Sequence, residues 1–135
     1  MLTILEKADL LQSVEIFQEF RTQSLARVAA IAQEAHFEAR QRLFGENEAA
    51  DGMFVILEGE VTLTRLGAQE RKLTKGQVAG AFSLLANQPQ AETATANRPV
   101  HALRIGQQDL FDAMTEDFEV TRGILRSLAG MAASR

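Results

Sequence analysis

Cysteine, tryptophan and tyrosine are all absent from this chain, and it contains two histidines. Without cysteine, neither a disulfide nor a thiolate metal site can form. No run of 18 apolar residues occurs, which argues against a membrane-spanning helix, and the first residues lack the basic and apolar regions of a signal peptide. We therefore expect a cytoplasmic domain that does not insert into a membrane.

The charge balance is mildly acidic, with 14 Lys and Arg against 18 Asp and Glu. Nucleic-acid-binding surfaces usually carry a basic patch, so a net charge of −4 argues against direct contact with nucleic acid. Apolar residues make up 46% and charged residues 24%, which is typical of a globular protein. The 135 residues suit a single domain, 1–135, with one core.

Helical periodicity marks both ends of the chain. Near the N-terminus, Ser24 is a candidate N-cap for a helix whose apolar face comprises Leu25, Val28, Ala29, Ala32 and Ala35. Near the C-terminus, a short helix around Leu110 precedes a longer one that starts near Asp117 and carries Phe118, Thr121, Ile124, Leu125 and Leu128. We expect N-terminal helices over 1–35 and a C-terminal helix pair over 107–135.

Between the helices, short apolar segments recur about every ten residues or less, punctuated by glycines. The clearest predicted strands span 53–57, 61–66, 91–96 and 100–105, and Asn97 to Pro99 form the turn between the last two. The predicted fold class is α+β: an antiparallel, jelly-roll-like β-roll of about eight short strands over 36–105, flanked by helices.

Residues 78–93, Val-Ala-Gly-Ala-Phe-Ser-Leu-Leu-Ala-Asn-Gln-Pro-Gln-Ala-Glu-Thr, have the layout of a loop and short helix that cradle an anion. A glycine followed by a short apolar helix turn can aim free backbone N–H groups at a phosphate. A sugar-phosphate ligand would also need a carboxylate for a hydroxyl and an arginine for the charge.

The order of elements and several motifs resemble the cyclic nucleotide-binding domain family. Residues 11–17 are similar to the family's L-x-x-V-x-x-F entry motif, and 44–47 and 50–61 are similar to the turns and strands that follow. Asn47 stands where the family usually has glycine, and asparagine tolerates the same left-handed backbone. Residues 108–111 match the start of the helix after the roll.

Family members that bind cyclic nucleotides carry F-G-E-x-x-L-L followed by P-R-x-A. These motifs fall on 79–85 and 89–92, where Gly80, Leu84, Leu85 and Pro89 keep the pattern. The resemblance implies that Ala81 replaces the glutamate that accepts from the ribose 2′-hydroxyl and that Gln90 replaces the arginine that binds the phosphate. Glu92 replaces a small residue and adds negative charge. The implied vestigial ligand site comprises Gly80, Ala81, Phe82, Ser83, Leu84, Gln90, Ala91 and Glu92.

Losing both side chains should weaken binding by roughly three or more decades, since hydrogen bonds to charged groups contribute about 1.5–3 kcal/mol each. We therefore expect weak or no binding of cyclic AMP or cyclic GMP, and no cofactor. We expect Leu84 and Leu85 to pack against the roll, and Phe82 to be a core residue rather than a lid. The candidate replacement cations are interpreted as solvated surface charges: Arg71, Lys72, Lys75, Arg98 and Arg104.

Catalytic and metal sites find little support in the sequence. A metalloenzyme with a β-roll needs clustered histidines, whereas His36 and His101 form no H-x-H pair and are interpreted as ordinary strand residues. The glutamates at 46, 48, 58 and 60 lie in turn-like segments, and no Ser/His/Asp arrangement stands out. We predict a protein that is not an enzyme, with no catalytic residues and no metal site.

The leading functional hypothesis is a regulatory or interaction module with a degenerate ligand site. The alternative is a working sensor that binds cyclic AMP, cyclic GMP or another phosphate-bearing molecule and controls an attached effector. A DNA-binding role would need a helix-turn-helix beyond Arg135. The long apolar stripe of the last helix predicts either a homodimer or partner-domain contact, or packing against the chain's own roll.

Overall fold

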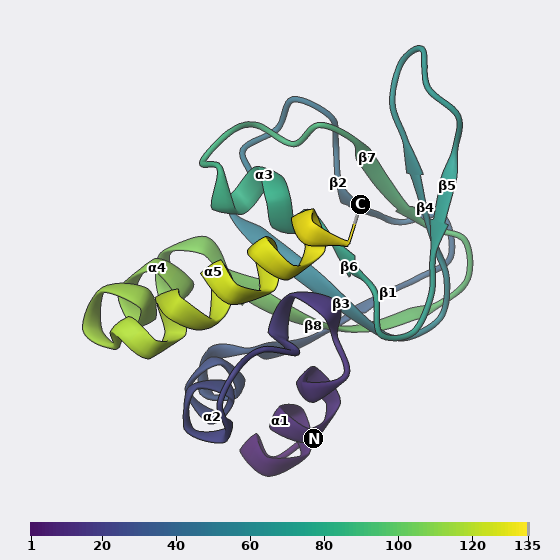
Figure 1. Cartoon of the computed structure of the whole chain (residues 1–135). Coiled ribbons are helices and arrows are strands. Elements are labelled where there is room, and N and C mark those ends of the chain that lie inside the picture. Colours follow the sequence, from purple (N-terminus) through teal and green to yellow (C-terminus); the bar gives the residue numbers. More distant parts are fainter. Residues whose placement is uncertain (135) are drawn as a thin grey trace.

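The computed structural model describes residues 1–134, which form five α-helices, a 3₁₀ turn and eight strands (Figure 1). The helices and the 3₁₀ turn are α1 (Ile4–Gln12), η1 (Glu15–Phe17), α2 (Thr22–Ile31), α3 (Ala81–Leu85), α4 (Gln107–Glu116) and α5 (Phe118–Ala133). The strands are β1 (Gln33–Phe37), β2 (Arg42–Phe44), β3 (Gly52–Glu58), β4 (Val61–Thr64), β5 (Arg71–Leu73), β6 (Val78–Ala79), β7 (Thr93–Ala96) and β8 (Val100–Gly106).

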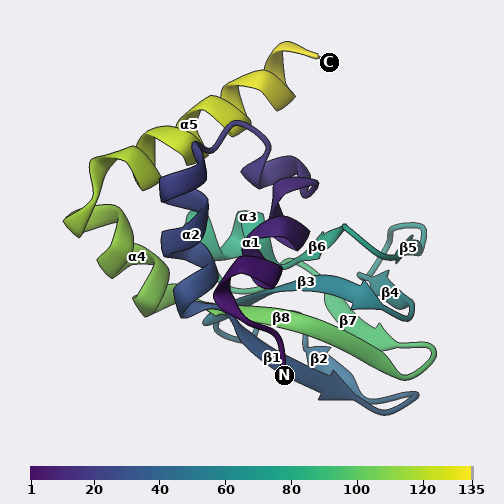
Figure 2. The same ribbon diagram turned by 90° about the horizontal axis from the view of Figure 1, so that it is seen from below.

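The strands form two four-stranded antiparallel sheets, with the orders β1-β8-β3-β6 and β2-β7-β4-β5. The helices gather on one side of the roll, where α1, α2, α4 and α5 lie together (Figures 1 and 2). This arrangement confirms the predicted α+β class with a β-roll between N-terminal and C-terminal helices.

Strand β3 divides two hydrophobic cores. Met53 and Val55 point into the cluster shared with the helices, whereas Phe54 and Ile56 point into the interior of the roll. Because both faces of β3 are buried, its sequence is a continuous apolar run instead of an alternating one. Helix α3 lies within residues 78–93, the segment called the cassette below. It packs on the helix-side core through Leu84, so the cassette is anchored to β3.

Two details of the predicted N-terminal helix are wrong. Ser24 is not an N-cap but lies inside α2, which is preceded by Arg21 in extended conformation and starts at Thr22. Ala35 does not belong to the helix either, because the chain becomes extended at Ala32 and Ala35 pairs with Ala102 of β8. The roll therefore begins at Gln33, and the pairing with β8 overrides the helical propensity of alanine.

Left-handed backbone occurs at the positions that the motifs require. Asn47 has a φ of 70°, which confirms that asparagine serves there in place of glycine. Gly59 has a φ of 101° in the turn between β3 and β4. Gly80 has a φ of 85° and stands directly before α3, so it turns the chain from β6 into the cassette helix.

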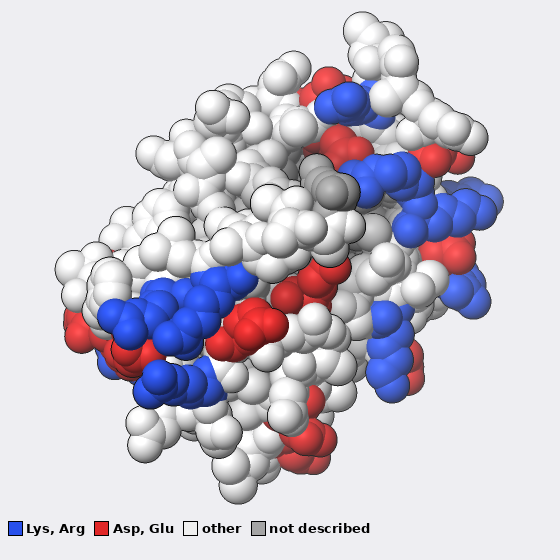
Figure 3. Space-filling model, in the orientation of Figure 1, with Lys and Arg blue, Asp and Glu red and all other residues white. Residues whose placement is uncertain are grey.

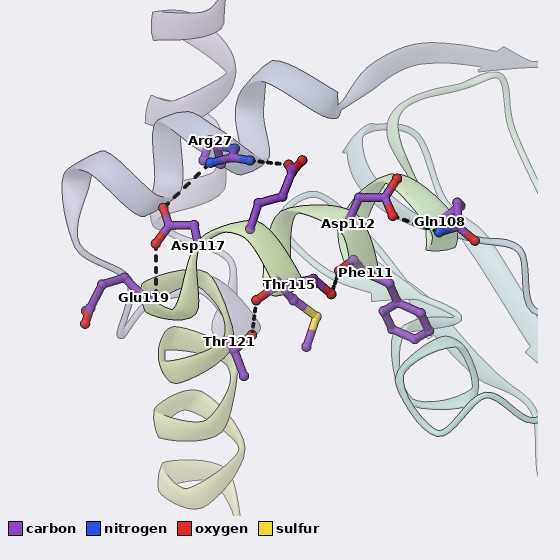
Figure 4. A network of polar contacts seen from close by, with 10 residues as sticks. Arg27, Gln108, Phe111, Asp112, Thr115, Asp117, Glu119 and Thr121 are labelled. Carbon is purple, nitrogen blue, oxygen red and sulfur yellow. Dashed lines mark hydrogen bonds and ion pairs between the residues drawn. The ribbon is translucent and has the colours of Figure 1, made fainter.

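The junction of α4 and α5 is held to α2 by polar contacts (Figure 4). Arg27 of α2 donates to Glu116 at 2.6 Å and lies 4.0 Å from Asp117, whose side chain also caps α5 by accepting from the Glu119 N–H. Thr121 donates to the Met114 carbonyl across the bend. These contacts set the angle at which α5 crosses back over the other helices.

Helix α5 buries one face and exposes another. Val120, Ile124 and Ser127 are buried, which shows that part of the apolar stripe packs on the chain's own core. Phe118 and Leu125 remain 60% and 56% exposed. No helix within residues 1–134 combines the length and apolar character needed to cross a membrane.

The charged side chains mix signs over the face seen in Figure 3. Basic and acidic groups alternate over the helical part, where Arg21 and Arg122 lie near Glu119, and again over the β4–β5 side. This face carries no extended patch of only positive or only negative side chains, in agreement with the small net charge.

Candidate functional site

A pocket of about 260 Å³ lies between the cassette segment and the β-roll. Strand side chains from β2, β4, β5 and β6 form one wall of the pocket, and the loop and helix that follow β6 form the other. The lining residues are Phe44, Leu63, Arg71, Leu73, Val78, Gly80, Ala81, Phe82, Ser83, Gln90, Ala91 and Glu92. Seven of the eight residues proposed from the sequence line it, and Leu84 does not.

Leu84 and Phe82 point in opposite directions from α3. Leu84 is fully buried in the helix-side core, as predicted, and Leu85 packs against the same core. Phe82 is 57% exposed, so its expected place in the core is wrong. The short α3 buries its Leu84 side against β3, which leaves the Phe82 side directed outward over the pocket.

A second cavity of about 340 Å³ adjoins the first. Ala81 and Phe82 line both spaces, so the α3 residues form a thin wall between them. Met131, near the end of α5, lines the second cavity together with Ile16 of η1. Ala81 therefore borders both spaces, although it is itself 6% exposed and belongs to the helix-side core.

The backbone of Gln90 is clamped to the turn between β2 and β3. Its N–H donates to the Glu48 carbonyl and its carbonyl accepts from the Asn47 N–H, both at 2.8 Å. The Glu48 carboxylate closes the same turn by accepting from the Gly45 N–H at 2.7 Å. Position 90 is therefore held in place by hydrogen bonds that do not depend on its side chain.

The Gln90 side chain is 2% exposed and fills the corner of the pocket next to Gly80. A Cβ atom at position 80 would lie 3.1 Å from Gln90 Nε2 and 3.2 Å from the Phe44 ring. The amide group thus lies directly against the Gly80 backbone. A neutral amide can donate one hydrogen bond to an anion here, but it carries no charge to meet a phosphate.

Arg71 and Glu92 form an ion pair across the pocket. Arg71 Nη2 lies 2.9 Å from Glu92 Oε1 and 3.1 Å from Oε2. Arg71 is exposed, as expected of a surface charge, but β5 directs it to the pocket rim, where Glu92 is its partner. Its side chain is 62% exposed, so it is still reachable from solvent.

The other candidate cations lie elsewhere. Lys72 and Arg98 are 4.0 Å and 3.8 Å from Glu60, and Asn97 donates to the same carboxylate, which lowers the pKa of Glu60. Arg104 donates to the Asp51 carbonyl. The sequence offered Arg71 as one of five candidate cations and could not distinguish it from the others, since its partner Glu92 lies 21 residues away on another segment.

Ser83 links the two halves of the cassette. Its hydroxyl oxygen accepts from the Ala91 N–H at 3.3 Å, so that backbone donor is already engaged. The Ser83 O–H itself is left to donate toward the pocket. An incoming anion would therefore meet a hydroxyl at this point rather than a free backbone N–H.

The model of the family described as "Cyclic nucleotide-binding domain" matches residues 34–117, more than half of the chain. The chain belongs to the cyclic nucleotide-binding domain family. The match covers the whole roll, the cassette and α4, and it confirms the resemblance seen in the motifs. The family is one of regulatory domains, so the chain is a cyclic nucleotide-binding domain of the regulatory kind. A search among curated protein sequences returned no match.

Solved structures share the fold at low sequence identity. A candidate cyclic nucleotide-binding protein from Ruegeria pomeroyi has a TM-score of 0.80 at 21% identity, covering 95% of this chain and 59% of that one. The N-terminal domain of a transcriptional regulator from Streptomyces coelicolor has a TM-score of 0.80 at 26% identity, covering 93% and 91%. The chain thus spans about three fifths of the Ruegeria protein and nearly all of the Streptomyces domain.

A third similar structure is the regulatory subunit of a cAMP-independent protein kinase A from Trypanosoma brucei. It has a TM-score of 0.75 at 17% identity and covers 82% of this chain and 42% of that one. The solved form is a triple mutant with cAMP in its A site, in which a glutamate and a valine are changed to alanine and a threonine to arginine.

Proposed function

We propose that this chain is a regulatory and interaction module whose pocket binds cyclic nucleotides weakly or not at all. The observation that carries the proposal is the ion pair between Arg71 and Glu92. The one guanidinium among the pocket-lining residues is already paired with the chain's own carboxylate. A cyclic phosphate would have to separate that pair and then lie close to the Glu92 charge.

The interactions that the pocket offers disfavour binding of a cyclic nucleotide. A partly exposed ion pair contributes only about 0–1 kcal/mol, so separating it is not by itself prohibitive. The ligand, however, finds an amide at Gln90 in place of a guanidinium and a methyl group at Ala81 in place of a carboxylate. The pocket of about 260 Å³ is also smaller than the ~300–1,000 Å³ usual for ligand sites.

We expect isothermal titration of the wild-type chain with cyclic AMP and cyclic GMP to give dissociation constants weaker than ~100 µM, because two charged hydrogen-bond partners are missing. A dissociation constant in the low micromolar range or tighter for either nucleotide would contradict the degenerate-site proposal.

The trypanosome protein supports this interpretation by its chemistry. It is a cAMP-independent regulatory subunit, and its cAMP-bound form has gained an arginine and lost a glutamate. In this chain, the corresponding kind of change would be the gain of arginine at position 90. The glutamate of the trypanosome protein lies seven residues before that arginine, whereas Glu92 lies two residues after Gln90, so the two carboxylates are not equivalent. We propose that a missing cation keeps this pocket from holding a cyclic phosphate.

The alternative is a sensor for a different phosphate-bearing molecule, and the position of Arg71 favours it. The Arg71 guanidinium lies at the rim, and Gln90 and Ser83 can each donate from the wall formed by α3 and its following loop. An anion that displaced the Glu92 carboxylate would meet all three donors. Glu92→Gln should then strengthen binding of inorganic phosphate, because it frees Arg71 without altering the pocket's size. If neither the wild type nor Glu92→Gln binds phosphate or a cyclic nucleotide, the interaction-module proposal is favoured.

We further propose that α5 carries the contact with a second copy of the chain, through the exposed Phe118 and Leu125. Light scattering at ~100 µM should give a mass near twice the 14.8 kDa of one chain, since that concentration populates even a weak dimer. Leu125→Lys should shift the mass toward the monomer. Leu66→Lys is a suitable control, because Leu66 is 96% exposed on the distant β4–β5 hairpin. A monomeric wild-type mass would contradict the dimer.

The proposed mode of action is regulation by contact and not catalysis. The chain would control an attached or bound effector, whose identity is outside these residues. The Streptomyces neighbour is the N-terminal domain of a transcriptional regulator, which illustrates one such arrangement on the same fold.

A further inference from the structure

The fold brings both histidines of the chain together on one edge of the helix-side sheet, far from the cassette. His36 of β1 and His101 of β8 are directly opposite each other in the antiparallel ladder. Their imidazole rings are stacked, with centroids 4.4 Å apart and planes inclined by 5°. Glu34 precedes His36 by two residues on β1, so its side chain leaves the sheet on the same face.

The three side chains are already in mutual contact. His101 Nε2 lies 2.9 Å from Glu34 Oε1, and one ligand atom from each of Glu34, His36 and His101 lies within 4.8 Å of the others. Ligands of one tetrahedral zinc ion are separated by ~3.3 Å, because Zn–N and Zn–O bonds are ~2.0–2.2 Å long. The Glu34–His101 distance needs to open by only a few tenths of an ångström. His36 is exposed and can rotate the remaining distance.

The N-terminal segment orients the carboxylate. The Leu2 N–H donates to Glu34 Oε2 at 2.7 Å, which leaves Oε1 for His101 (the N-terminus lies beside β1 in Figure 2). This backbone bond fixes the orientation of the Glu34 carboxylate, so that Oε1 faces the two histidines. Carboxylates that bind metals are commonly held in this way, by a hydrogen bond to one oxygen while the other faces the ion.

We propose that Glu34, His36 and His101 form a binding site for a divalent transition-metal ion of the zinc class. Two imidazoles and one carboxylate suit Zn²⁺ and similar ions, and they leave a fourth position for water. Both histidines line an open surface depression of about 680 Å³, which provides access for the ion and the water. The ion would tie β1 to β8 and, through Glu34, to the N-terminal segment.

The test is a calorimetric titration of the untagged chain with ZnCl₂ alone. We expect one equivalent to bind with micromolar affinity. His36→Asn and His101→Asn should each weaken binding at least tenfold, because losing a direct ligand costs more affinity than losing a residue that only hydrogen-bonds to a ligand. Glu34→Gln should weaken it less, since an amide oxygen can still coordinate. Glu70→Gln, which removes an exposed carboxylate on the β4–β5 hairpin, should leave it unchanged.

A second measurement needs no variant. With two histidines in the chain, an imidazole-selective NMR spectrum contains two ring systems, and both should shift together up to one equivalent of Zn²⁺. The proposal is overturned if the two rings do not respond, or if Zn²⁺ binds the histidine variants as tightly as it binds the wild type.

Discussion

The triple variant Ala81→Glu, Gln90→Arg and Glu92→Ala is expected to bind cyclic AMP or cyclic GMP at least about a hundredfold more tightly than the wild type, the scale of one pair of charged hydrogen bonds. Arginine restores a two-pronged donor for the cyclic phosphate, and glutamate restores an acceptor for the ribose hydroxyl. Removing Glu92 also releases Arg71 from its ion pair, which adds a second cation at the rim.

The structure makes these replacements feasible without rebuilding the site. The backbone of residue 90 is held by Asn47 and Glu48, so a longer side chain there projects from a fixed origin. Gly80 has the left-handed conformation that starts α3, and Ala81 borders both the pocket and the adjoining cavity, into which a longer side chain can extend. Calorimetric titration of the wild type and the triple variant under identical conditions gives the ratio of their dissociation constants for each nucleotide.

A matched control comes from the same loop. Gln88→Arg makes the same substitution as Gln90→Arg two residues earlier, but at an exposed position outside the pocket. It should leave nucleotide affinity at the wild-type level. If the triple variant folds normally and gains no affinity, the pocket cannot open to admit a nucleotide. The interpretation that these three substitutions can restore nucleotide binding is then wrong.

Gly59→Ala is expected to destabilise the protein by about 2–4 kcal/mol. Gly59 has a φ of 101°, which L-residues rarely adopt, and an added Cβ atom would collide with the Pro99 carbonyl oxygen and press on Val100. The turn between β3 and β4 would have to move away from the start of β8. Chemical denaturation followed by circular dichroism measures the change in the free energy of unfolding.

Gly67→Ala separates the cost of backbone strain from the cost of steric collision. Gly67 has a φ of 79°, but no atom outside its chain neighbours lies within 4 Å of an added Cβ. This variant should lose about 1–2 kcal/mol from backbone strain alone. Equal losses at the two positions would show that the contact with Pro99 contributes nothing and would contradict the steric part of the argument.

Local patterns in the sequence were sufficient for the family and the fold class. Asn47, Gly59 and Gly80 stand where the backbone turns left-handed, and the spacing of the motifs over 79–92 is intact. The exact ends of the elements were less predictable. Ala35 looked helical because alanine favours helices, and only its pairing with Ala102 placed it in a strand.

The sequence predicted which side chains line the pocket but not how they pair. Ala81 and Gln90 could be identified by position, and the loss of charge followed from their chemistry. The partner of Glu92 could not be identified, because several basic residues lie at comparable distances along the chain. Strand β5 directs Arg71 to the pocket rim, whereas Lys72, its immediate neighbour, lies near Glu60.

The sequence by itself determined that this chain is a β-roll of the cyclic nucleotide-binding domain family with alanine at position 81 and glutamine at position 90, because those features reside in residue identity and short-range spacing. Tertiary structure alone decided that Arg71 pairs with Glu92, that Phe82 faces outward, and that His36 meets His101 and Glu34. The first and the last depend on which strands pair and in what register, whereas the direction of Phe82 follows from the packing of α3 on β3. Because side chains alternate between faces of a strand, a shift of one residue would turn Arg71 or the histidines to the opposite face of their sheet.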